Sequence, residues 1–359
     1  MYKIKKITDM VKSKKIMIWV AAVVLVLGLV AAGFAAQYYL DNRKPNFQKE
    51  YVLYVYPDMT AEQVLDSIVR GAQPERPSSV EHVFKKMNVA ENMKPGRYVI
   101  EPSKPSVYVA RMLVYGWQTP QNLTLSGTIR SKERLVKKIS NQMMVDSATV
   151  ASALSDSVFL AQYGFTPENV FAMIMQDTYE MYWTASIKEI FDRFKKEYDA
   201  FWTNTRVSKA KKLGLSKMDV SIVASIVSGE TLKEFEYPMI AGVYLNRYRI
   251  GMKLQADPTV AFCFDYKLNR ILHRHMEVDS PYNTYKHVGL PPAPINVPPK
   301  ACLEAVLNPD QHGYIYFCAS PEFNGTHRFA VTYEEHLKNA NEFHQALNAR
   351  ERAKKAAAN

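Results

Sequence analysis

Cysteine is scarce in this chain of 359 residues. The three copies are Cys263, Cys302 and Cys318, and no two of them form a CxxC pair. An odd number of cysteines without that spacing excludes a dense disulfide framework and a zinc ribbon. One bridge between two of the three stays open, but we expect them to be buried and to pack as small hydrophobic residues.

Long runs of basic residues are absent, although the formal net charge is +11. Part of the excess comes from lysines within residues 1–15, and the remainder is spread thinly along the chain. This charge favours a membrane surface or an anionic polymer, such as a cell-wall glycan, over nucleic acid as the partner. A metal site is not indicated either. His273 and His275 have the spacing of one face of a strand, but no third ligand lies close to them in the sequence. We therefore expect neither a metal nor a cofactor.

Charged residues are missing from Ile16 to Ala36, an apolar run long enough to cross a bilayer. The run is too long and too uniform for a cleaved signal peptide. Lysines precede it, and positive charge stays on the cytoplasmic side of a membrane. The pattern therefore predicts a cytoplasmic tail over residues 1–15 and a single transmembrane helix over residues 16–37. The bulk of the chain is expected outside the bacterial plasma (inner) membrane, in the periplasm or its equivalent.

A polar linker over residues 38–47 and a small α+β module over residues 48–127 are expected next. Thr60 and Gln63 have the spacing of a capping box, and the helical face that follows ends at Gly71. Strands are predicted over residues 50–56, 96–100 and 122–125, and a second helix over residues 106–115. Such a module binds a glycan or serves as a rigid spacer, and the pattern alone favours neither.

Residues 128–359 are predicted to form a second, mixed α+β domain. Helices are expected over residues 131–155, 191–210, 216–228 and 238–250 and from Tyr333 onward, and paired strands over residues 314–319 and 327–332. A loop with an Asp-Pro turn is expected over residues 251–259, and irregular segments over residues 280–285 and 289–294. Loops beside a helical scaffold are where sites tend to lie. The aromatic stretch from Gln176 to Trp183 either lines a groove or packs into a core.

The most informative residue is Glu230, at the end of an apolar helical pattern that Ser216 can cap. Gly229 is expected to break this helix just before the glutamate. Burial would raise the pKa of a carboxyl group there. A carboxylic acid that keeps its proton near neutral pH is what the cleavage of a glycosidic bond requires. The alternative is a helix-end glutamate bound to a nearby backbone amide or arginine.

Several segments in the second domain together resemble a known family. They are Ala224-Ser-Ile-Val with Glu230-Thr231, Ala241-Gly-Val-Tyr-Leu-Asn-Arg247, Gly251-Met-Lys-Leu-Gln-Ala-Asp-Pro-Thr259, Ser280-Pro-Tyr-Asn-Thr-Tyr285, Gly289-Leu-Pro-Pro292 and His327-Arg-Phe329. Their order and spacing resemble those of the MltG (YceG-like) endolytic murein transglycosylases. The resemblance implies a membrane segment, a LysM-like module and a catalytic domain whose acid is Glu230. The chain departs from the family pattern at Ser228-Gly229, where many members have Glu-Lys, at Gln176, which replaces a proline, and at Ser126-Gly-Thr.

The resemblance implies endolytic cleavage of the MurNAc–GlcNAc β-1,4 bond within peptidoglycan strands, giving 1,6-anhydro-MurNAc ends and terminating the elongation of nascent strands. Peptidoglycan synthases of the elongation or division machinery are possible partners on this interpretation. Two alternatives stay open. One is a scaffold that binds peptidoglycan without cleaving it. The other is a hydrolytic muramidase, which needs a second carboxylate, and Asp257 is the candidate nearby.

Eight further residues are predicted to contact the substrate. They are Asn246, Arg247, Gln255, Asp257, Tyr282, Asn283, Tyr285 and His327. Gln255, Tyr282 and Asn283 are expected to hold acetamido and hydroxyl groups of the sugars. Arg247 either faces carboxylates of the substrate or forms a structural salt bridge. Asp257 can instead cap its turn, and His327 can instead form a hydrogen bond at a strand end.

Overall fold

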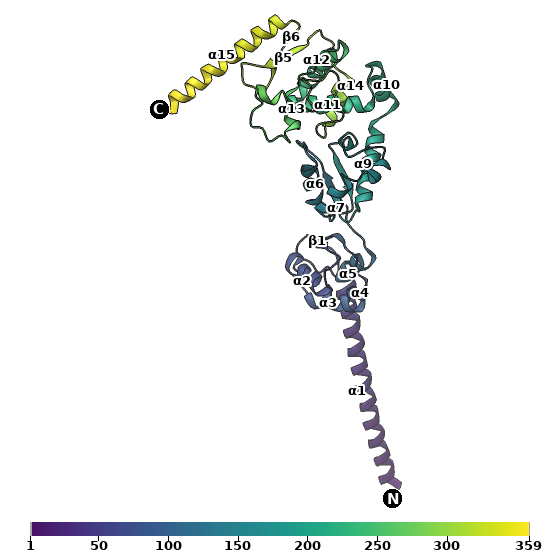
Figure 1. Cartoon of the computed structure of the whole chain (residues 1–359). Helices are drawn as coiled ribbons and strands as arrows, with labels where there is room; N and C mark the ends of the chain where they lie inside the picture. The colour runs from purple at the N-terminus through teal and green to yellow at the C-terminus, as the bar shows by residue number, and fades with distance from the viewer. Residues whose placement is uncertain (1, 359) are drawn as a thin grey trace. The chain divides into compact units, whose positions relative to one another are not determined.

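The computed structural model (Figure 1) describes the backbone of residues 2–358 and the side chains of residues 14–354. Side chains of the expected cytoplasmic tail up to residue 13 therefore lie outside the described part. The chain forms two compact units, Met1–Gln121 with Tyr182–Thr184, and Asn122–Met181 with Ala185–Asn359. The mixed α+β class is confirmed. The boundary between the units falls after Gln121, earlier than the predicted boundary at residue 127.

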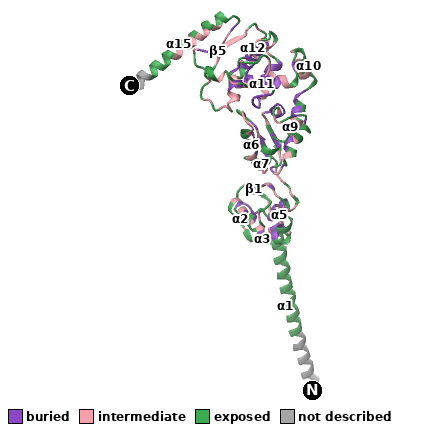
Figure 2. Ribbon diagram, viewed as in Figure 1, coloured by how far each residue is buried: buried purple, intermediate pink, exposed green. Residues whose placement is uncertain are grey.

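Helix α1 (Tyr2–Asn42) opens the first unit. Its part from Lys14 to Asn42 is long and apolar enough to cross a membrane. The apolar side chains along it are exposed, as Figure 2 shows. The linker predicted over residues 38–47 is not a separate segment, because α1 continues to Asn42 and Phe47 is already buried in the core of this unit.

The C-terminal end of α1 is attached to the folded part of the first unit by buried polar contacts. Asp41 is 2% exposed and accepts hydrogen bonds of 2.6 Å from Ser79 Oγ and of 2.6 Å from His82 Nδ1. Asn46 Nδ2 donates to Ser106 Oγ at 2.8 Å, and Ser106 Oγ lies 2.9 Å from Ser79 Oγ. Buried polar groups held by several partners fix one geometry. Helix α1 and the elements that follow it are therefore one structural unit.

The rest of the first unit consists of a two-stranded antiparallel sheet and four helices. Its elements are β1 (Tyr51–Val55), α2 (Ala61–Ala72), α3 (Pro77–Lys86), α4 (Val89–Asn92), β2 (Gly96–Ile100) and α5 (Ser106–Tyr115). The capping box of Thr60 is confirmed, and Gly116 ends α5 with a φ of +67° that glycine adopts easily. Helices α3 and α4 were not predicted. The predicted third strand, β3 (Gln121–Thr124), pairs with β4 (Thr178–Met181) instead of with this sheet. The resemblance of this unit to a LysM module stays a prediction.

The N-terminal half of the second unit is more segmented than its sequence suggests. The helix predicted over residues 131–155 is interrupted and forms α6 (Lys132–Ser140) and α7 (Ser147–Ala153), followed by α8 (Ser157–Ala161). The next predicted helix is likewise two, α9 (Ile187–Phe201) and α10 (Asn204–Lys212). Asp146 and Thr203 cap α7 and α10 through side-chain hydrogen bonds, and such caps start new helices.

The aromatic stretch from Gln176 to Trp183 serves mainly to pack. Tyr179 is fully buried in the core of the second unit. Trp183 belongs to the first unit, where its ring lies 4.9 Å from the ring of Tyr54 and 4.8 Å from that of Tyr56. The packed core therefore holds for Tyr179 and Trp183, whereas Tyr182 is exposed and Gln176 lies in the wall of a cavity.

The centre of the second unit is α11 (Lys217–Glu230), in which every side chain from Val220 to Val227 is buried. It packs against α14 (Lys300–Leu307), α12 (Tyr237–Arg249) and α13 (Asp257–Cys263). The capping box formed by Ser216 and Asp219 is confirmed. The predicted break at Gly229 is wrong, because the helix runs through this residue and ends at Glu230.

Two more sequence expectations change in this half of the unit. Asp257 and Pro258 begin α13 instead of forming a turn, and proline is also common at the first position of a helix. His273–His275 form a short 3-10 helix, η3, instead of a strand. The strands β5 (Tyr316–Ala319) and β6 (His327–Ala330) pair in antiparallel fashion as predicted, and α15 (Tyr333–Ala358) follows them.

All three cysteines are free thiols. Cys302 is buried, as predicted, whereas Cys263 and Cys318 are only half-buried. The expectation that all three would be buried is therefore wrong for two of them.

Candidate active site

Glu230 is the last residue of α11, where the buried side of the helix meets the surface. Tyr244 Oη, from α12, donates a hydrogen bond of 2.5 Å to Glu230 Oε1. Burial raises the pKa of Glu230 to about 7, and the charge of Asp257 adds to this, while the Tyr244 hydrogen bond and the charge of Arg247 act in the opposite direction. The residue as a whole is half-buried and so keeps some surface for a substrate. Near neutral pH this carboxyl group can both give and take a proton.

A second carboxylate, that of Asp257, lies at the start of α13. Tyr285 Oη donates a hydrogen bond of 2.6 Å to Asp257 Oδ1. Asp257 is exposed, and its charge contributes to the raised pKa of Glu230. Burial is the main cause of the raised pKa of Tyr285, followed by its hydrogen bond to Asp257. The structure thus brings together three of the predicted residues, Glu230, Asp257 and Tyr285.

Arg247 is bound by backbone carbonyls of the protein, and its predicted contact with substrate carboxylates stays a prediction. Its side chain is buried, and Nε donates to the carbonyl of Ile315 at 2.5 Å while Nη1 donates to the carbonyl of Leu254 at 2.6 Å. The guanidinium carbon also lies 5.5 Å from the centre of the Tyr316 ring. Arg247 therefore connects the loop before α13 to the segment that leads into β5, and acts on Glu230 through its charge.

Two other predicted residues, Asn246 and Asn283, donate their side-chain hydrogen bonds to the protein itself. Asn246 Nδ2 donates to the carbonyls of His312 and Tyr314, at 2.8 and 3.0 Å. Asn283 is fully buried, and its Nδ2 donates to the carbonyls of Met276 and Val278, both at 2.8 Å. These contacts shape the loops around the site and leave the two amide NH₂ groups without a free donor.

His327 has the second of its two predicted roles, a hydrogen bond at a strand end. Its Nδ1 lies 3.0 Å from Glu236 Oε2, and its backbone N–H donates to Glu236 Oε1 at 2.8 Å. Glu236 is buried and also accepts a hydrogen bond from Thr231 Oγ1 at 3.1 Å. Because Thr231 follows Glu230 directly, this contact holds β6 against the end of α11.

The remaining predicted contacts, Gln255 and Tyr282, are accessible. Gln255 is exposed, has a left-handed φ of +48° and donates its backbone N–H to the carbonyl of Thr284 at 3.1 Å. Tyr282 is half-buried, with its ring 4.6 Å from that of Phe262. Their role as substrate contacts stays a prediction.

Sequence reasoning missed the residues that support the end of α11 from other segments. Tyr244 was not among the predicted site residues, yet it is the direct partner of Glu230. Ser228 Oγ donates to Asn296 Oδ1 at 2.9 Å, and Asn296 Nδ2 donates to the carbonyl of Ser225 at 2.7 Å. A cavity of about 230 Å³ lies here, with Ser228, Asn296 and Gln176 in its wall. The departures of the chain from the family pattern at Ser228-Gly229, at Gln176 and at Ser126-Gly-Thr were the signals that pointed to this place.

Gly229 brings α11 and α13 close together, which gives a first prediction. A Cβ atom at this position would lie 2.6 Å from Cβ of Pro258, so Gly229→Ala should push the start of α13 away from Glu230. We expect a destabilisation of about 1–3 kcal/mol from overpacking and reduced activity, measured by denaturant unfolding and by turnover. Gly313→Ala, whose Cβ would meet nothing closer than 3.8 Å, is the matched control. At an open helical position, alanine would stabilise the helix relative to glycine. A Gly229→Ala variant that is more stable than the wild type would therefore contradict this packing.

Tyr244 gives a second prediction. Its hydrogen bond favours the charged form of Glu230, so Tyr244→Phe should raise the pKa of Glu230 above its value of about 7. The high-pH limb of a kcat/KM profile, which reports the acid of the free enzyme, is expected to move to higher pH. Tyr248→Phe, on the same helix, should leave the limb in place. A limb that stays, or moves to lower pH, in Tyr244→Phe would refute the assignment.

The fold and the site define a mixed α+β protein with one half-buried glutamic acid at the end of a central helix, supported by a tyrosine and faced by an aspartate. The pattern of the YceG-like family matches residues 53–342, and the chain belongs to that family.

Two relatives and one solved structure are similar to the chain. The endolytic murein transglycosylase of Bacillus subtilis (strain 168) is 36% identical over 153 residues, covering 43% of this chain and 42% of that protein. The endolytic murein transglycosylase of Streptococcus pneumoniae serotype 2 (strain D39) is 22% identical over 360 residues, covering 90% of this chain and 65% of that protein. The chain thus spans less than two thirds of these relatives. A crystal structure of a yceG-like protein from Listeria monocytogenes has a TM-score of 0.54 at 24% identity, covers 80% of this chain and 98% of that one, and shows the likeness of fold alone.

Proposed function

We propose that this protein is a peptidoglycan lytic transglycosylase that cleaves the MurNAc–GlcNAc β-1,4 bond within glycan strands. The observation that carries the proposal is the raised pKa of Glu230, about 7, at an accessible helix end. Two relatives that bear the name endolytic murein transglycosylase support it. A carboxyl group with this pKa is protonated often enough at neutral pH to act as an acid, and ionised often enough to act as a base.

The proposed reaction uses Glu230 twice. Its carboxyl group first protonates the oxygen of the scissile bond, so that the GlcNAc side leaves and an oxocarbenium-like centre forms at C1 of the muramic acid. The resulting carboxylate then takes the proton of the C6 hydroxyl of the same sugar, and the C6 oxygen attacks C1. The product is 1,6-anhydro-MurNAc, and the reaction consumes no water. The hydrogen bond from Tyr244 Oη holds the carboxyl group in place during both transfers.

One observation favours a second candidate, a hydrolytic muramidase. The charge of Asp257 acts on Glu230, so the two carboxyl groups are near neighbours. A retaining or inverting hydrolase uses such a pair, with the second carboxylate as a nucleophile or as the base that activates water. Against this, Asp257 Oδ1 already accepts the Tyr285 hydroxyl. A scaffold that binds peptidoglycan without turnover is the third candidate, and it leaves the raised pKa of Glu230 without a use.

The proposal extends to the location of the protein. Helix α1 would anchor it as a single-pass protein of the plasma membrane, with the lysine-rich N-terminus in the cytoplasm and the two units outside. From that position the enzyme would end the elongation of nascent strands beside the synthases that make them, and the LysM-like first unit would bind glycan.

Product analysis tests the proposal and separates the three candidates. Full-length protein in detergent and its Glu230→Gln variant are incubated with purified peptidoglycan, and the soluble fragments are analysed by mass spectrometry. Anhydro ends that are absent with the variant support the lytic reaction. Reducing MurNAc ends, heavier by one water molecule, make the enzyme a muramidase and point to Asp257. Cleavage by neither protein, with retained binding of peptidoglycan, supports the scaffold.

A further inference from the structure

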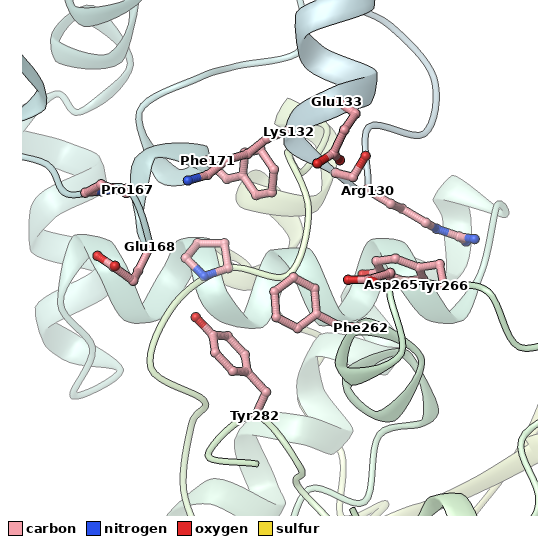
Figure 3. A pocket seen from close by; sticks show the side chains of 12 residues that line it. Arg130, Lys132, Glu133, Pro167, Glu168, Phe171, Phe262, Asp265, Tyr266 and Tyr282 are labelled. Atoms are coloured by element: carbon pink, nitrogen blue, oxygen red, sulfur yellow. The ribbon is translucent and has the colours of Figure 1, made fainter. Parts of the chain in front are cut away.

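A cavity of about 310 Å³ in the second unit lies apart from Glu230 and has no role in the mechanism above. Figure 3 shows the rings of Phe171, Phe262 and Tyr282 around it. These rings come from three separate parts of the chain, and Arg130 and Lys132 stand beside them at the start of α6. The cavity therefore combines an apolar wall with two cations.

The two cations are held without a salt bridge in the part of the chain that the structure describes. Among the described side chains, neither Arg130 nor Lys132 forms a salt bridge, and Arg130 Nε is buried without a hydrogen-bond partner. The Arg130 guanidinium is held 5.0 Å from the ring of Tyr266. Burial lowers the pKa of Lys132, although the charges of Glu168 and Glu133 oppose that effect. Cations that are partly removed from water and form no salt bridge favour an anionic ligand group.

Negative charge also lies near Lys132, but it is more exposed to the solvent. Glu133, Glu168 and Asp265 line the cavity and are exposed, whereas Arg130 and Lys132 are half-buried. A ligand that complements this arrangement carries a carboxylate in the half-buried part of the cavity and an ammonium group toward the solvent. The turn at the rim is held in a costly shape, because Asp265 and Tyr266 both have left-handed φ values, +52° and +56°. Non-glycine residues in this region are kept only where the surroundings impose them, often at ligand sites.

Helix α13 connects this cavity to the candidate active site. Asp257 begins the helix beside Glu230, and Phe262, near its end, lines the cavity. Its seven residues make the helix about 10 Å long. An extended peptide covers the same length, about 10 Å, in three residues. A peptide stem that starts on the sugar at Glu230 can therefore place its third residue in the cavity.

We propose that this cavity binds the zwitterionic free end of a diaminopimelate-type residue at the third position of the peptide stem, with the carboxylate toward Lys132 and the ammonium group toward the exposed acids at the rim. This inference rests on the proposed function, because it takes peptidoglycan as the substrate. The aromatic rings hold the methylene chain of the residue. A stem whose amine is acylated loses the ammonium group and binds less tightly.

Calorimetric binding of small ligands to the full-length protein in detergent tests the proposal. The probe is an N-acetylmuramyl tripeptide that ends in diaminopimelate, and its two matched analogues carry an amide at the distal carboxylate or an acetyl group on the distal amine. We expect the amide to bind about 10-fold more weakly, which is the effect of one lost charged hydrogen bond. Lys132→Met should weaken the parent ligand to a similar extent and abolish the difference from the amide. Lys137→Met, an exposed position on the same helix, is the control.

Three results would overturn the inference. The first is equal affinity for the parent tripeptide and both analogues. The second is equal affinity of the wild type and the Lys132→Met variant for the parent tripeptide. The third is an affinity for N-acetylmuramic acid alone that equals the affinity for the tripeptide, which would make the cavity a sugar site. None of the ligands contains a glycosidic bond, so the measurement does not depend on cleavage. Loss of stem binding with normal anhydro products would refute this inference alone, whereas stem binding without any cleavage would refute the lytic function alone.

Discussion

Replacement of Glu230 by glutamine is expected to lower turnover by a factor of about 10² to 10⁴, the usual contribution of a general acid–base group. Glutamine keeps the shape of the side chain and can still accept the Tyr244 hydrogen bond, but it cannot give or take a proton. The rate of release of fragments from purified peptidoglycan measures the effect. Glu180→Gln, an exposed position on β4, is the control. Turnover within a factor of a few of the wild type would exclude Glu230 as the acid.

The same variant should be more stable than the wild type at alkaline pH. The pKa of Glu230 is raised from an ordinary value of 4.5 to about 7, so between these values the folded state holds a proton that the unfolded state has lost. The free energy of unfolding of the wild type therefore falls as pH rises from about 4.5 to about 7 and stays lower above that range. Glutamine carries no such penalty, and we expect a gain of about 2–3 kcal/mol at pH 8 and none at pH 4. Denaturant unfolding at the two pH values checks this, and equal stability at pH 8 would contradict the raised pKa.

Replacement of Arg247 by methionine should destabilise the protein more than Gly229→Ala does. The guanidinium is 7% exposed and donates to the carbonyls of Ile315 and Leu254. Methionine has a similar length but no donor, so two carbonyl groups lose a charged partner. We expect a loss of about 3 kcal/mol or more in the free energy of unfolding, since each hydrogen bond to a charged group contributes about 1.5–3 kcal/mol.

The matched control for this variant is Arg249→Met, two residues along the same helix and exposed. It should change the stability by less than about 0.5 kcal/mol, as surface substitutions usually do. Chemical unfolding of both variants gives the comparison. Similar values for the two would mean that Arg247 does not hold the loops together. In the Arg247 variant we also expect the pKa of Glu230 to rise further, because a cation that lowers it is gone.

Local signals in the sequence were enough to single out Glu230 and to place many element boundaries. The capping boxes at Thr60 and Ser216 and the end of α5 at Gly116 depend on residues within one turn of a helix. Glu230 could be singled out because its position at the end of a buried apolar face is itself a local pattern. The raised pKa followed from that position, and the structure bears it out.

Contacts between residues far apart in the sequence could not be predicted from local sequence patterns. Asn246 and Asn283 were predicted to contact the substrate, yet their amides donate to backbone carbonyls that only the folded chain brings near. The same holds for Arg247 and for His327, whose partner Glu236 lies 91 positions earlier. Gly229 was taken for a helix break because glycine weakens helices, but its role is to let Pro258 approach.

The rigid end of α1 fixes the distance between the first unit and the bilayer if the helix crosses the membrane as proposed. From Gln37, where the predicted span ends, to Asn42, where the helix ends, the backbone rises by only about 8 Å. Asp41 is already clamped by Ser79 and His82 within that distance. The first unit would thus lie directly on the outer surface of the bilayer, because no flexible linker separates it from the membrane-spanning part of the helix. Glycan strands deep in the wall would be out of reach for that unit, and only material close to the lipid would come within its range.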